Sequence, residues 1–150
     1  AAFALLPGRV SALLREPPES LAARSAHLPR TLTHGDFKVA NFALMPDGRV
    51  AAFDWAVIGA GPVATELGWH LAVNATRLPG TKERSIARYR QALESALGRA
   101  LGDPFWTQTV DNAVLAGGAM MLWSKALALE SGTARALAEW EWWVERLAAL

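Results

Sequence analysis

Residues 34 to 55 contain the side chains whose types and spacing could do chemistry. The stretch reads "HGDFKVANFALMPDGRVAAFDW", and its polar members include His34, Asp36, Asn41 and Asp54. Two carboxylates and one amide offer oxygen ligands. Mg²⁺ favours sites where one or two protein oxygens are completed by substrate phosphates and water. The pattern therefore indicates phosphoryl transfer, in which the protein positions a nucleophile, neutralises phosphate charge and holds magnesium.

Each of these side chains has a role in that reaction and a plainer alternative. Asp36 is placed to accept the proton of an attacking hydroxyl, although a single Asp is most often a turn or cap residue. Asn41 follows five residues later, as in the kinase loop H-R-D-x-x-x-x-N. Asp54 would supply a second oxygen ligand, although Asn41 and Asp54 are also common turn residues. Lys38 either places its ammonium against the transferring phosphate or is a solvated loop charge. His34 is expected to support the loop structurally.

The elements that must position these residues follow from the flanking sequence. "RTLTH" favours a strand before the motif, and the runs "NFALM" and "RVAAFDW" enclose "PDG", which favours a reverse turn and hence a β-hairpin. Glycine-rich "GAGP" is interpreted as a break. Helical patterns cover residues 10–15, 18–27, 62–76, 82–99, 103–130 and 133–149. The prediction is an α+β fold that is mainly α.

Composition narrows the class of protein. With 150 residues and about half of them apolar, residues 1–150 are expected to form a single domain. A net charge of +1 gives no sign of nucleic acid as a partner. The absence of cysteine suits a reducing, cytoplasmic setting. The longest apolar run, residues 114–123, is shorter than the roughly 20 residues of a membrane helix, so no membrane partner is expected.

Charge is unevenly distributed along the chain. Residues 103–150 carry three Lys and Arg against six Asp and Glu, whereas residues 1–102 carry twelve against eight. The acidic C-terminal part would suit a cationic substrate, and it is equally what a solvated helical surface looks like.

The motif resembles that of the aminoglycoside phosphotransferase and choline kinase group within the protein-kinase-like superfamily. The residues that carry the resemblance are His34, Gly35, Asp36, Asn41, Asp54 and Trp55, with "GPVATELGWHL" after them. It implies a kinase-like C-terminal lobe with a small β-hairpin and a helical bundle. It further implies Asp36 as catalytic base, Asn41 and Asp54 as Mg²⁺ ligands, ATP or another nucleoside triphosphate as donor, and a small-molecule hydroxyl substrate.

The chain also departs from that family. Lys38 stands where many members have His, and Glu66 stands where the family usually has Asp. A glycine-rich phosphate loop and an ATP-pairing lysine are not found before residue 31. The expectation is therefore a fragment of a larger kinase, inactive alone, whose nucleotide site needs an N-terminal lobe or a partner chain. The alternative is a catalytically silent lobe that acts as a binding or interaction module.

Overall fold

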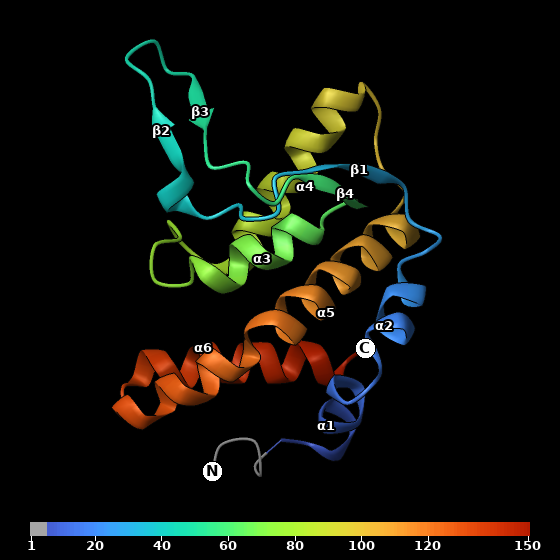
Figure 1. The fold of residues 1–150 in the computed structure, drawn as a ribbon, viewed down its shortest axis with the longest axis vertical. Helices are drawn as coiled ribbons and strands as arrows, with labels where there is room; N and C mark the ends of the chain where they lie inside the picture. The colour runs from blue at the N-terminus through green and yellow to red at the C-terminus, as the bar shows by residue number, and fades with distance from the viewer. Residues whose placement is uncertain (1–5) are drawn as a thin grey trace.

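Helices make up most of the fold, and two small antiparallel sheets lie at one end of it (Figure 1). The computed structural model describes residues 6–150. The helices occupy the segments in which they were predicted, to within a few residues, so the mainly α, α+β prediction is confirmed. Their bounds are α1 Gly8–Leu14, α2 Pro18–Arg24, α3 Thr65–Val73, α4 Lys82–Leu97, α5 Asp103–Ala128 and α6 Ala134–Ala148, with short 3₁₀ turns at Val39–Asn41 (η2) and Leu129–Ser131 (η3).

The predicted β-hairpin is present. Strands β2 (Phe42–Leu44) and β3 (Val50–Ala52) pair antiparallel, with Phe42 opposite Ala52. Gly48 has a φ of +83°, and the Arg49 backbone N–H donates to Asp47 Oδ1 at 3.0 Å, which closes the turn. The hairpin projects away from the helices (Figure 1). Its base therefore joins the end of η2 to the segment that carries Asp54.

The second sheet was predicted only in part. Strand β1 (Arg30–Thr33) pairs antiparallel with β4 (Gly59–Pro62), the "GAGP" segment that the sequence indicated was only a break. A strand of Gly, Ala and Pro shows no alternation of apolar and polar residues, so nothing in its pattern marks it. A Cβ on Gly61 would lie 3.0 Å from Thr33 Cγ2, so glycine permits the close pairing. Helix α3 consequently begins at Thr65 and not at residue 62.

Helix α5 is the centre of the core and crosses between α3 and α6 (Figure 1). Two glycines make the α3 crossing possible, because a Cβ on Gly68 would lie 1.9 Å from Ala113 O and one on Gly117 would lie 2.5 Å from Gly68 O. Close packing explains the Gly117-Gly118 pair that would otherwise weaken the helix. Backbone therefore meets backbone where α3, which borders the motif, joins the core.

The tryptophan-rich helix α6 supplies the other side of the core. Trp140, Trp143 and Leu147 are buried, as their helical spacing predicted. Trp142 lies off that face and is partly buried, with its indole N–H donating to Glu83 Oε1 at 2.5 Å. The helix thus packs on α5 with one face and contacts α4 with another residue.

The segment Asp103–Ser131, which is α5 with its 3₁₀ extension, is long and apolar enough by composition to cross a membrane, because it contains an 18-residue window with a mean hydropathy of 1.2. The apolar run 114–123, which alone is too short for a membrane helix, therefore lies within a longer segment that meets the length and composition of one. Central helices of globular folds meet the same criteria, and buried residues of α5 such as Val114 and Leu122 pack in this core. Length and composition are thus weak evidence for a span.

Candidate active site

The loop between β1 and β2 holds the first part of the motif, residues 34–41, and His34 ties this loop to the hairpin. His34 is 2% exposed, and its Nε2 lies 2.9 Å from the carbonyl oxygen of Phe53. A carbonyl only accepts, so Nε2 carries the proton, which leaves Nδ1 to accept the Asp36 backbone N–H at 3.3 Å. The imidazole is thus a neutral ring that fixes the backbone of Asp36 relative to Phe53.

Gly35 allows the loop to turn beneath the hairpin. Its φ is +83°, and a Cβ at this position would lie 2.3 Å from the carbonyl oxygen of Val57. Its N–H donates to Glu66 Oε1 at 2.7 Å, which links the loop to the first turn of α3. Glu66 therefore supports the loop backbone.

Asp36 is held by three donors, two from its own loop and one from helix α3. Lys38 Nζ and Asn41 Nδ2 donate to its Oδ2 at 2.5 and 3.1 Å, and Trp69 Nε1 donates to its Oδ1 at 3.0 Å. The hydrogen bond from Lys38 is the main cause that lowers the pKa of Asp36, with smaller effects in the same direction from Trp69 and Asn41. The carboxyl group is therefore ionised at neutral pH and fixed in orientation.

Asn41 is buried, and one atom of its side chain, Oδ1, has no hydrogen-bond partner within residues 6–150. Its Nδ2 also donates to the Asp36 backbone oxygen at 3.0 Å. Its Oδ1 accepts no hydrogen bond from residues 6–150, and it is not among their buried unpaired atoms. The amide is therefore oriented by Asp36, with its oxygen available to a ligand.

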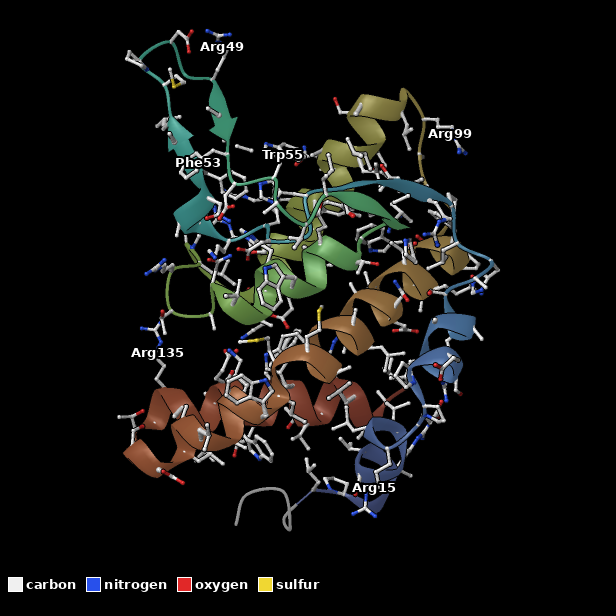
Figure 2. The ribbon with its side chains drawn as sticks, in the orientation of Figure 1. Arg15, Arg49, Phe53, Trp55, Arg99 and Arg135 are labelled. Carbon is white, nitrogen blue, oxygen red and sulfur yellow. The ribbon has the colours of Figure 1, made fainter. Side chains whose placement is uncertain are left out.

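The Asp54 side chain is not part of this hydrogen-bonded group, but the backbone next to it is bonded to Asn41. The N–H of Phe53 donates to the Asn41 backbone oxygen at 3.1 Å, so Asp54 directly follows a residue bonded to Asn41. Asp54 is exposed and has a φ of +65°, and within residues 6–150 its carboxylate has no hydrogen bond or ion pair. Figure 2 shows Phe53 and Trp55 at the base of the hairpin, whereas Arg49 lies at its tip.

Helix α3 contributes residues whose part in the site the sequence did not reveal. Asn74 is 1% exposed and accepts the Val39 N–H at 2.9 Å, and His70 Nδ1 lies 3.0 Å from the carbonyl oxygen of Phe37. His70 was expected to have a satisfied ring nitrogen, which is confirmed. Glu66, Trp69 or His70, and Asn74 recur every three to four residues. That polar spacing on an otherwise apolar helix is the signal that could have found them.

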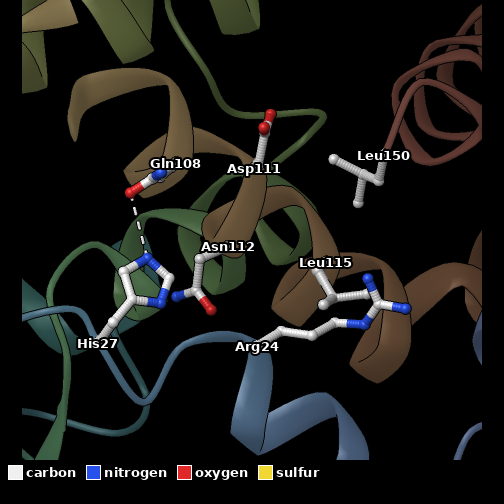
Figure 3. Close-up of a pocket in the computed structure, with 7 residues that line it drawn as sticks. All are labelled: Arg24, His27, Gln108, Asp111, Asn112, Leu115 and Leu150. Carbon is white, nitrogen blue, oxygen red and sulfur yellow. Dashed lines mark hydrogen bonds between the residues drawn. The ribbon is translucent and has the colours of Figure 1, made fainter. Parts of the chain in front are cut away.

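A pocket of about 170 Å³ between α2 and α5 lies apart from the motif (Figure 3). In it, His27 Nε2 lies 3.1 Å from Gln108 Oε1. Its arginine, Arg24, is paired with Glu16 at 2.5 Å. No motif residue lines the pocket, so it is separate from the loop that holds Asp36.

Comparison with known proteins adds one match. No curated protein and no solved structure matched the chain. The model of the phosphotransferase enzyme family, APH, matches residues 2–105, a range that contains His34, Asp36, Asn41 and Asp54 and ends at the start of α5. The match covers more than half of the 150 residues, and by it the chain belongs to the phosphotransferase enzyme family.

Proposed function

We propose that this chain forms the catalytic-loop side of an ATP-dependent kinase that phosphorylates a hydroxyl group of a small molecule, with Asp36 as the base. The observation that carries the proposal is the geometry at Asp36, whose carboxylate is held by donors from Lys38, Asn41 and Trp69. An ionised carboxylate fixed in this way is prepared to orient a hydroxyl and accept its proton.

In the proposed reaction, the substrate oxygen forms a bond to the terminal phosphorus of ATP. The bond from that phosphorus to the bridging oxygen breaks and ADP leaves, while the hydroxyl proton passes to Asp36. Lys38, now paired with Asp36, also brings a positive charge to the place where the phosphoryl group would be transferred. His34 and Glu66 hold the loop backbone so that Asp36 keeps its orientation.

The donor set near the hairpin base fits a magnesium ion. The amide oxygen of Asn41 and the carboxylate of Asp54 have no partner within residues 6–150, and both are hard oxygen ligands. Within residues 6–150, no group of three or more His, Cys, Asp or Glu side chains could hold a metal ion. A magnesium ion held by Asn41 and Asp54 would take its remaining ligands from phosphates and water. When bound, Mg²⁺ would neutralise phosphate charge, and Asn41 and Asp54 would hold it.

The exposed apolar surface beside this site supports a further part of the proposal. Large apolar side chains of the hairpin and the segment after it are 42 to 77% exposed, namely Leu44, Val50, Phe53, Trp55, Val57 and Ile58. Clustered apolar exposure marks an interaction surface. We infer that an N-terminal lobe or a partner chain covers it and completes the nucleotide site.

The same surface favours the second candidate, a catalytically silent lobe that binds a partner. The two are separated by a phosphate-transfer assay on the chain joined to its complementing lobe, over a panel of hydroxyl and amine substrates. Turnover that falls at least about 10²-fold in Asp36→Asn supports the kinase. If the complete, folded protein binds no Mg²⁺–nucleotide and transfers no phosphate, the result supports the interaction module and contradicts the kinase.

A further inference from the structure

A second pocket lies directly beside the catalytic loop. It has a volume of about 330 Å³, at the lower end of the range for small-molecule sites. Phe37, the residue after the proposed base, forms one wall. The others come from one face of α3, one face of α4 and the connection between them, with lining residues Glu66, Leu67, His70, Leu78, Pro79, Ser85, Arg88 and Tyr89.

The walls of this pocket are mainly apolar, and its polar groups come from Glu66, His70, Ser85, Arg88 and Tyr89. His70 Nδ1 lies 3.0 Å from the carbonyl oxygen of Phe37 and 3.0 Å from Asn74 Nδ2, so this nitrogen is occupied by the loop and by the end of α3. The Nε2 of the same ring has no hydrogen bond within residues 6–150 and can therefore bond to the hydroxyl group of an alcohol. The Ser85 hydroxyl already lies 3.3 Å from the carbonyl oxygen of Thr81. A compact molecule with one hydroxyl and one ring would match these walls.

The charges around the pocket decide which molecules it suits. Glu66 is its only acid, and one carboxylate oxygen already accepts the Gly35 N–H. Arg88 is exposed, and its guanidinium has no hydrogen bond or ion pair within residues 6–150. None of the acidic residues of 103–150 lines the pocket, so the acidic C-terminal part gives it no affinity for cations. Glu66 keeps its negative charge but is bound to the loop, whereas Arg88 is the charged lining group whose side chain has no partner within residues 6–150.

We propose that this pocket binds the acceptor of the proposed phosphotransfer and selects a compact, largely apolar alcohol that carries a carboxylate or similar anionic group, paired with Arg88. A polycationic amino sugar would need several carboxylates, and the pocket offers one, Glu66, which also holds the Gly35 backbone. Arg88 pairs with planar anions through two parallel hydrogen bonds, which adds geometric selectivity. The inference rests on the proposed function only for the fate of the bound alcohol.

Three single-ring probes of one shape test the charge preference: 4-(hydroxymethyl)benzoate, 4-(hydroxymethyl)benzylamine and 1,4-benzenedimethanol. Each is titrated into the ¹⁵N-labelled chain, and the amide shifts of the pocket residues give location and affinity. The benzoate is expected to bind at least about tenfold more tightly than the amine and to shift the amides of Phe37, Leu67 and Tyr89. In Arg88→Gln its affinity should fall to that of the neutral diol. Arg99→Gln, a matched loss of an exposed arginine away from the pocket, should change nothing.

The outcomes separate this inference from the proposed function. Equal or tighter binding of the amine, no effect of Arg88→Gln, or no pocket shift at millimolar probe would each overturn the substrate class. Binding of the benzoate needs neither nucleotide nor Mg²⁺, so it stands if the assembled protein transfers no phosphate. Conversely, phosphorylation of cationic alcohols that depends on Asp36 but not on Arg88 would keep the kinase and overturn this inference.

Discussion

At the scale of single residues, the site is organised around Asp36, and its electrostatics can be measured directly. Lys38 is the main reason that the pKa of Asp36 is lowered. In Lys38→Met the carboxyl pKa should rise toward the usual value of about 4, as followed by ¹³C NMR titration. Arg49→Met, which breaks the Arg49–Asp47 pair at the hairpin tip, is the matched control and should leave the Asp36 titration unchanged. An unchanged pKa in Lys38→Met would show that the pair does not form.

The same shift predicts a pH dependence of stability. Because the pKa of Asp36 is lower in the folded than in the unfolded chain, its contribution is present above about pH 4 and is lost as pH falls through the folded-state value. The stability advantage of the wild-type chain over Asp36→Asn should therefore shrink below about pH 4. Urea unfolding of both proteins from neutral to acid pH measures this. An advantage that stayed constant or grew on acidification would contradict it.

Asn74 is the test of how α3 supports the loop. Its side chain accepts the Val39 N–H and donates to the His70 carbonyl at 3.1 Å. Asn74→Ala should lower the free energy of unfolding by about 1–2 kcal/mol and speed amide exchange at Val39. Gln108→Ala, at an exposed position of α5, should have little effect on either measurement. Unaltered exchange at Val39 would mean that Asn74 does not hold the loop.

At the scale of elements, the sequence predicted what has a periodic or turn signal and missed what does not. The hairpin followed from "PDG" between apolar runs, and the four later helices followed from their spacing. Strand β4 was missed because Gly, Ala and Pro pair through backbone alone. The contacts from Trp69 and Asn74 to the loop were missed because they join residues more than 30 positions apart. Motif spacing located Asp36 and Asn41, but not the helix that supports them.

The crossing of α3 and α5 yields the prediction at this scale. A Cβ on Gly68 would overlap the backbone of Ala113, which cannot yield as a side-chain tip could. Gly68→Ala should therefore cost at least about 2–3 kcal/mol in unfolding free energy and loosen the loop that α3 supports. Gly8→Ala, at the start of α1 with no atom within 4 Å of the added Cβ, should be neutral or slightly stabilising. A stable Gly68→Ala chain would show that the helices are farther apart.

At the scale of the whole molecule, one side of the proposed nucleotide site is open and apolar. Asn41 and Asp54 offer two oxygens, so a magnesium ion there would take its remaining ligands from phosphates and water. Holding those phosphates requires donors on the other side, and the exposed side chains from Phe53 to Ile58 mark where a second lobe would contact the chain. The two oxygen ligands and the apolar side chains belong to one surface. Phosphate transfer should therefore appear only when a second lobe covers that surface.

We therefore expect no appreciable ATP-dependent phosphate transfer from residues 1–150 alone. Loss of even one preorganised donor costs about 10²- to 10³-fold in rate, and in the short chain a whole set would be missing. Joining the complementing lobe should restore turnover and, in the same protein, slow amide exchange at Val57 and Ile58, which are 60% and 52% exposed in this chain. Asp36→Asn in the joined protein should lose the turnover but keep the slowed exchange. Turnover by the short chain at the rate of the joined protein would contradict the expectation and show that residues 1–150 hold the nucleotide without help.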